Sequence, residues 1–405
     1  MSLRFNRRYC QALVLPLASA ALQASGSSDE LRISGFLTQG YFHSDHNNIY
    51  GPSEDGSFDF REVGVNASWR VQSSLRLAGQ LMSRRAGEVD DGSLQTDYLL
   101  LDWRIQDLAL RQTGLRLGRL KVPLGLYNDT RDVAFTRPSI LLPQEIYYDM
   151  ARDLALSVDG AGVYYQSMAT GYQFDFDLVA GLPKRDRGVE YSYLHDDHPG
   201  RFDSGSALIG RLLMSDPAQR WKAGLSLLSF ELDYEDDLPP VTPLAPDEGT
   251  LRVDIAVLSA QYSRERWTFA SEYMWQHIDR GELGGLFSLQ PETDLEAWYL
   301  QAQYRFATGW DLIARYGEGY IDRDDRSGRG YQQLLGGIGV DVPAYTRYAK
   351  DLTLGVGWQP SANWLLRAEW HLVRGTLWLP RQDNPEPSGL EKNWNLHALQ
   401  ATYRF

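Results

Sequence analysis

The chain ends in Leu399-Gln400-Ala401-Thr402-Tyr403-Arg404-Phe405, in which apolar and polar side chains alternate up to the terminal aromatic residue. A strand with lipid on one side must place every second residue in hydrocarbon, while the residues between them face a wet lumen. An ordinary amphipathic edge strand of a soluble protein is the alternative. The pattern predicts the last strand of a transmembrane β-barrel.

The same period of two recurs along the whole chain. In the stretches 172–178, 298–306 and 364–372, aromatic and aliphatic residues occupy every second position, and the positions between them are mostly polar. Strict alternation over such lengths predicts strands rather than helices. No stretch after the amino terminus approaches the roughly 20 apolar residues that a membrane helix needs.

The composition agrees with a barrel. Aromatic residues make up 12% of the chain, with 23 Tyr and 12 Trp, yet the mean hydropathy is negative. A membrane barrel explains this combination, because only alternate residues touch lipid and amphipathic rings collect at the two membrane interfaces. The formal charge of −13 argues against a nucleic acid as partner.

Sixteen strands are predicted, an even number, as a barrel with both ends on one side of the membrane requires. Short connections, such as 72–74 and 359–362, alternate with long polar ones. A soluble β-sandwich lacks this asymmetry and buries its aromatic residues inward. The predicted strands are 31–43, 59–72, 74–85, 94–106, 113–122, 155–167, 171–182, 205–215, 219–234, 250–264, 265–277, 295–308, 309–320, 346–359, 362–375 and 394–405.

Both ends of the chain carry targeting features. Arg4, Arg7 and Arg8 precede an apolar run that contains Cys10, the single cysteine, and is too short to span a bilayer. We therefore expect a signal peptide over residues 1–24 and one barrel domain over 25–405, without disulfide or lipid anchor. At the other end, Phe405 with Tyr403 resembles the signal that the barrel-assembly machinery of Gram-negative bacteria reads.

The longest connection, residues 123–154, is the predicted constriction. Sixteen strands enclose a lumen too wide for side chains alone to fill, so a loop that folds inward would narrow it. The loop combines an apolar patch, residues 140–143, with many charges. A loop that folds outward as a surface lid is the alternative.

Around this loop the chain resembles the phosphate-selective porin superfamily. The resemblance is carried by Gly118-Arg119-Leu120-Lys121-Val122-Pro123-Leu124-Gly125, by Arg137-Pro138-Ser139 and by Asp159-Gly160-Ala161-Gly162. It implies a sixteen-stranded trimeric porin, commonly with a preference for anions. The chain departs from the family in having only five lysines and no traceable lysine ladder, so phosphate selectivity is not carried over.

Strand parity predicts which charges line the lumen. Arginines would favour carboxylates or phosphates through paired hydrogen bonds, and an opposing acidic wall would create a transverse field. The alternative is that these charges pair with their neighbours and only solvate the wall. By strand parity the predicted inward basic residues are Arg70, Arg76, Arg84, Arg104 and Arg116. A further basic group is predicted to cluster at the approach to the constriction: Arg119, Lys121, Arg131 and Arg137. The predicted acidic residues are Asp175, Asp177, Asp254, Glu272, Asp311 and Glu369.

Catalysis and metal binding find less support. A hydrolase needs a nucleophile, a histidine and an orienting group at one level of the wall, and the inward-facing His371 has Glu369 nearby but no evident serine. Residues 195–198 and 322–325 offer oxygen and imidazole groups without an established ligand spacing. We expect no enzyme, no cofactor and no metal site.

These observations favour a passive channel in the outer membrane of a Gram-negative bacterium. We expect a homotrimer, surrounded by membrane lipid and lipopolysaccharide, that admits small hydrophilic solutes with a preference for anions. The rival hypothesis is a structural or recognition barrel, occluded inside, that binds a partner through its long loops.

Overall fold

The predicted last strand closes a barrel by pairing with the first one. In the computed structural model, β16 (Asn393–Arg404) runs antiparallel to β1 (Leu31–Ser44). The amide of Phe405 donates to the carbonyl of Gly35 at 3.0 Å, and the amide of Gly35 donates back at 3.1 Å. The structure describes residues 31–405 except 170, 186, 195–197, 199 and 237–241, so the predicted signal peptide lies outside the described residues.

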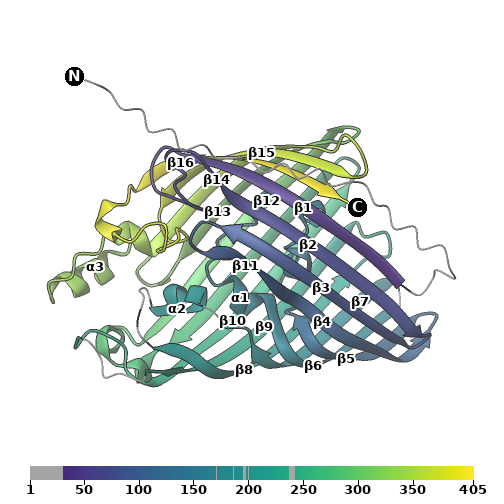
Figure 1. Cartoon of the computed structure of the whole chain (residues 1–405), viewed down its shortest axis with the longest axis horizontal. Helices are drawn as coiled ribbons and strands as arrows, with labels where there is room; N and C mark the ends of the chain where they lie inside the picture. The colour runs from purple at the N-terminus through teal and green to yellow at the C-terminus, as the bar shows by residue number, and fades with distance from the viewer. Residues whose placement is uncertain (1–30, 170, 186, 195–197, 199, 237–241) are drawn as a thin grey trace, which may run out of the picture.

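All sixteen predicted strands are present, and each pairs antiparallel with its neighbours in chain order, which makes the sheet a closed barrel (Figure 1). Each observed boundary lies within a few residues of its prediction. The remaining strands are β2 (Ser57–Gln72), β3 (Leu75–Ala86), β4 (Asp90–Leu108), β5 (Arg111–Lys121), β6 (Ser157–Ala169), β7 (Tyr172–Pro183), β8 (Arg201–Ser215), β9 (Trp221–Glu235), β10 (Gly249–Arg264), β11 (Trp267–Asp279), β12 (Glu292–Ala307), β13 (Trp310–Tyr320), β14 (Tyr348–Trp358) and β15 (Trp364–Gly375).

The connections alternate in length, as predicted. At one end of the barrel, here called the turn end, strands are joined by a few residues, for example 73–74 and 308–309. The opposite end, here called the loop end, carries long connections such as 321–347, and Figure 1 shows α3 projecting there. The helical segments are η1 (Asn128–Thr130), η2 (Ala134–Thr136), α1 (Arg152–Leu156), α2 (Arg187–Leu194), η3 (Gly281–Leu283), η4 (Gly285–Leu289), α3 (Arg329–Gly336), η5 (Ala344–Arg347) and η6 (Pro387–Gly389).

The two faces of each strand meet different surroundings. On β12, Tyr299 is fully buried inside the barrel, whereas its neighbour Leu300 is 57% exposed on the outside. Apolar residues therefore form an outer belt, because a membrane barrel is apolar where it faces lipid. Other apolar residues form packed clusters within the lumen. Among the helices of the described residues, none has the length and apolar character needed to cross a membrane.

Aromatic rings collect near the turn end of the outer face. Trp310 and Trp358 stack with their ring centroids 5.2 Å apart, and Trp267 lies 4.5 Å from Tyr304. A second group, nearer the loop end, includes Trp298 and Tyr316, whose ring centroids are 5.8 Å apart. Two such belts mark the membrane interfaces of a barrel, where amphipathic rings are favoured.

A charge placed between these belts tests which face meets lipid. Leu300 lies between Trp298 and Tyr304 on the outer face of β12, so Leu300→Arg should destabilise the folded barrel by about 2–4 kcal/mol. Denaturant titration in lipid vesicles, followed by tryptophan fluorescence, measures this change. Gln303→Arg is the matched control, because Gln303 faces the lumen and contacts Asp311 at 3.1 Å. Equal effects of both variants would contradict the assigned faces.

Candidate functional site

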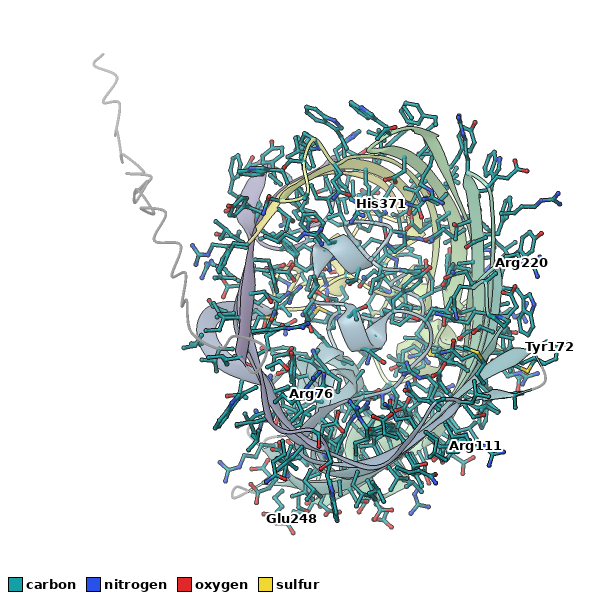
Figure 2. All side chains as sticks on the ribbon, turned by 90° about the vertical axis from the view of Figure 1, so that its right-hand side faces the viewer. Arg76, Arg111, Tyr172, Arg220, Glu248 and His371 are labelled. Atoms are coloured by element: carbon teal, nitrogen blue, oxygen red, sulfur yellow. The ribbon has the colours of Figure 1, made fainter. Side chains whose placement is uncertain are left out.

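The segment between β5 and β6, residues 122–156, folds into the barrel (Figure 2). Its backbone amides donate to side chains of three separate strands: Gly125 to Ser226 of β9 at 3.0 Å, Leu126 to Glu272 of β11 at 3.0 Å, and Ile140 to Glu369 of β15 at 2.5 Å. The predicted inward-folded loop is therefore confirmed, and the alternative of an outward lid is wrong. We call this segment the inner loop.

Glu272 holds the first part of the inner loop. Its carboxylate accepts hydrogen bonds from the hydroxyls of Tyr147 at 2.5 Å and Tyr299 at 2.8 Å, and from the amide of Leu126. Gly125 adopts a positive φ of 55°, and a side chain there would collide with the Tyr147 hydroxyl and with Glu272. The glycine of the porin-like motif is thus needed where the loop turns against the wall.

A buried ionic cluster fixes the centre of the inner loop. Arg84 of β3 contacts the carboxylates of Glu62, Asp90 and Asp149, and Arg131 reaches Asp149 at 3.3 Å. Arg84 and Asp149 are each only 7% exposed. Although burial opposes it, the nearby guanidinium groups hold the pKa of Asp149 well below its usual value. Each buried charge of this cluster therefore has an opposite charge beside it inside the structure.

A second ionic cluster joins the loop to its flanking strand. Asp132 contacts both Lys121 and Arg152, and Lys121 also reaches Asp97 of β4 at 2.5 Å. Asp97 and Asp132 are almost fully buried. Removing one partner of such a group leaves an uncompensated buried charge, which is strongly destabilising. These ion pairs therefore keep the inner loop in one position.

A third cluster, around His371 of β15, anchors the apolar patch of the loop. The His371 ring lies 3.1 Å from Asp351 and 3.3 Å from Glu369, which accepts from the Ile140 amide. The Thr353 hydroxyl is also 3.1 Å from the ring, but it is fully buried and donates to Asp351. This histidine, labelled on the barrel wall in Figure 2, therefore lies between two carboxylates and supports the loop through Glu369.

Arg131 and Arg137, predicted to line the constriction, are both buried. Arg131 is 2% exposed and donates to the Tyr147 carbonyl at 3.0 Å. Arg137 is 6% exposed, contacts Glu62 at 3.3 Å and donates to the carbonyl of Arg131 at 2.9 Å. Both side chains are used to hold the inner loop rather than being presented on its surface.

The predicted arginines near the turn end face the lumen and remain partly exposed. Arg76 contacts Asp102 at 2.9 Å with 48% of its side chain exposed, and Arg104 contacts Asp107 at 2.6 Å with 35% exposed. Arg70, on the same side of the wall, is also exposed. Exposed side chains that point into a closed barrel imply that solvent enters this part of the lumen.

Among the predicted acidic residues, Asp177 pairs with neighbouring cations, whereas Asp175 and Asp311 bond to neutral side chains. Asp177 contacts Arg116 at 3.4 Å and Arg211 at 3.2 Å. Asp175 accepts from Gln173 at 3.0 Å, and Asp311 also accepts a hydrogen bond from a glutamine. The contacts of Asp177 agree with the alternative of locally paired charges.

Two predicted lumen residues lie on the outer face. Asp254 sits beside Val253, which is fully buried inside, so Asp254 must point outward. Arg119 shares its parity with the outward Leu117 and contacts Asp159 at 2.7 Å. Their predicted positions in the lumen are wrong. Side chains alternate between the two faces of a strand, so an error of one residue in the assumed register moves a side chain to the opposite face.

The comparisons with known proteins identify the fold but no family. No protein-family model matches the chain, and no curated protein matches it. The resemblance to the phosphate-selective superfamily therefore remains a prediction.

Solved structures provide the fold assignment. An anion-selective porin from Comamonas acidovorans matches 93% of this chain and 99% of its own at 12% identity, with a TM-score of 0.56. OprB of Pseudomonas putida matches over 93% and 94% at 10% identity and a TM-score of 0.59. A trimer form of the Vibrio cholerae outer-membrane protein OmpT matches 93% of this chain and 99% of its own at 13% identity, with a TM-score of 0.54. The chain has the fold of a Gram-negative outer-membrane β-barrel.

Glu145 of the inner loop makes the structure sensitive to pH. It is 4% exposed, and neither carboxylate oxygen has a hydrogen-bond partner among the described residues. Burial, together with the negative charge of Asp351, raises the pKa of Glu145 to about 7. Because this pKa is above its unfolded value of about 4.3, the group's contribution to stability is complete at low pH and is lost as pH rises through 7.

Glu145→Gln should remove this dependence. At pH 8 the variant should melt at a higher temperature than the parent, by at most the equivalent of about 4 kcal/mol, and at pH 4 the two should melt together. Thermal unfolding in detergent, followed by circular dichroism, gives the comparison. Glu282→Gln, at an exposed position, should change neither value. A difference between Glu145→Gln and the parent that stays constant with pH would contradict the assignment.

Proposed function

We propose that the chain is a passive outer-membrane channel for small hydrophilic solutes, with a preference for anions. The proposal is based mainly on the exposure of three arginines that point into the closed barrel. Between 35% and 48% of the side chain is exposed in Arg76, Arg104 and Arg116. Water therefore reaches the lumen on the turn side of the inner loop. The similarity in fold to porins supports the proposal.

The proposed orientation follows the usual barrel arrangement, with short turns in the periplasm and long loops outside the cell. The signal peptide over 1–24, the assembly signal at Tyr403 and Phe405, and contact with lipopolysaccharide are parts of this proposal. A homotrimer is a further part. The outward ion pair between Arg119 and Asp159 supports it, because charged groups on the lipid face of a barrel are unfavourable unless another surface covers them.

The anion preference is based on the arginines near the turn end. Arginine provides a fixed positive charge that attracts anions at a pore wall. Arg70 and Arg76 lie on adjacent strands where β2 and β3 meet, and their registers pair directly. The wall at this point is therefore cationic, although Asp102 partly offsets Arg76.

Conductance decides between the channel and the rival recognition barrel. The purified protein, reconstituted in a planar lipid bilayer, should give discrete current steps that increase linearly with voltage. The physical reason is that a water-filled lumen conducts as an ohmic resistor. Heat-denatured protein from the same preparation is the control. A folded barrel that produces no steps would contradict the channel and favour partner binding through the loops.

The ion preference should depend on the turn-end arginines. Replacing Arg70, Arg76 and Arg104 together by Gln should shift the reversal potential in a salt gradient toward cation selectivity. Arg220→Gln is the matched control, because Arg220 lies on a turn outside the ring of strands (Figure 2) and pairs with Asp216 at 2.7 Å. A reversal potential that is the same in the triple variant and the parent would exclude these arginines from the selectivity of the pore.

A further inference from the structure

A large apolar cavity lies between the inner loop and the loop end. Its volume is about 910 Å³, within the range of sites that bind small organic molecules. Side chains of the inner loop, of strands β9 and β11 and of the loops at 280–291 and 321–347 form its walls. Representative apolar lining residues are Ile146, Phe230, Met274, Phe287, Leu335 and Val340.

Two arginines in this cavity wall differ from those of the inner loop. Arg280 is 3% exposed and Arg347 is 4% exposed. Neither has a carboxylate within ion-pair distance among the described residues, whereas Arg84 contacts three. Both instead lie over aromatic rings, Arg280 at 5.6 Å from the centre of Phe287 and Arg347 at 3.9 Å from that of Tyr331.

The polar contacts of these arginines are neutral and incomplete. Arg280 donates to the Thr293 hydroxyl at 2.7 Å and to the Tyr193 carbonyl at 3.5 Å, and its Nε has no partner among the described residues. Arg347 donates to the Gln290 side chain at 3.2 Å. Gln290 and Thr293 are three residues apart, so one short segment holds both guanidinium groups on the same side of the cavity.

Such an arrangement is unfavourable for the protein alone. A buried cation without an ion-pair partner loses its hydration and gains little in return. Asp279, Asp322 and Asp325 act on these arginines only from beyond ion-pair distance. Burial, with the neighbouring positive charge of Arg347, lowers the pKa of Arg280 to about 10, so the group still carries its charge at neutral pH. A bound anion would supply the missing partner.

We propose that this cavity is a binding site for organic anions that combine one carboxylate with an aromatic or alicyclic body. The carboxylate is held by Arg280 and Arg347, and the apolar body occupies the space lined by Phe230, Met274 and Leu335. Arginine suits this role because its planar donors match the two oxygens of a carboxylate. The inference rests on the proposed channel. In that channel the cavity would be the first binding site that a solute reaches, on the outer side of the inner loop.

The apolar walls determine which anions are bound. A small hydrated ion such as acetate gains little there, because it cannot cover the apolar surface and must give up its water. A larger ring system buries that surface and is favoured in proportion to the area removed from water. The uncharged amide of the same ring system fills the space but leaves the two guanidinium groups without a counter-charge.

Binding of three probes to the detergent-purified, folded protein tests the proposal directly. Isothermal titration calorimetry should show that 2-naphthoate binds at least about tenfold more tightly than either 2-naphthamide or acetate. Equal binding of naphthoate and naphthamide would overturn the role of the arginines. Equal binding of naphthoate and acetate would overturn the role of the apolar wall, and absence of naphthoate binding would overturn the site.

Variants connect the binding to the two arginines. Arg280→Met and Arg347→Met keep most of the side-chain volume and remove an unpaired buried charge, so both should fold and each should weaken naphthoate binding about tenfold or more. Arg326→Met is the matched control, because Arg326 belongs to the same loop end but is 56% exposed and pairs with Glu296. Unchanged naphthoate affinity in both cavity variants, checked for folding by thermal unfolding, would contradict the assignment.

The same probes separate this proposal from the channel itself. In planar bilayers, naphthoate added on the loop side should reduce the current of the parent and not that of Arg280→Met. Tight naphthoate binding by a protein that produces no current steps would contradict the proposed channel and support the proposed binding site. Normal conductance, with no effect of naphthoate on the current and no binding heat in calorimetry, would contradict the proposed binding site and support the proposed channel.

Discussion

The absence of water around the middle of the barrel is the constraint on which the other features depend. A backbone group that meets hydrocarbon has no solvent to bond, so every strand must find two neighbours and the sheet must close. Because the sheet closes through β1 and β16, each strand has one face toward lipid and one toward the lumen, and the period of two in the sequence follows from this. It also creates the lumen, because sixteen strands enclose more space than their own side chains fill.

The inner loop occupies much of that space, and both buried apolar side chains and buried charges hold it there. Arg84, Asp149 and Asp132 are buried in mutually compensating clusters, while Glu272 and Glu369 accept backbone amides of the loop. Buried ion pairs give modest net stability but penalise any rearrangement that separates them. Most of the charge near the loop therefore specifies its position and is not available to passing solutes.

The arginines of the proposed channel and of the proposed binding site lie on either side of the loop. Toward the turn end, Arg70 and Arg76 are exposed on the wall. Toward the loop end, Arg280 and Arg347 are buried without carboxylate partners beside an apolar cavity. In the proposed channel a solute would meet the apolar cavity with its two arginines first and the hydrated, arginine-lined wall afterwards, and the proposed anion preference is based on these arginines.

The sequence by itself determined the barrel, the number of strands, the alternation of turns and loops and the identity of the inner loop, because period two and connection length are local properties. It could also place Glu272 and Glu369 inside by parity. Tertiary structure alone decided which charges meet, since Arg84 and Asp149 are 65 residues apart and join only when the loop folds inward. It also decided that Asp254 faces outward and that Arg280 and Arg347 share one cavity. Those outcomes depend on strand register and loop path, which bring together residues from distant segments and leave no pattern in any one of them.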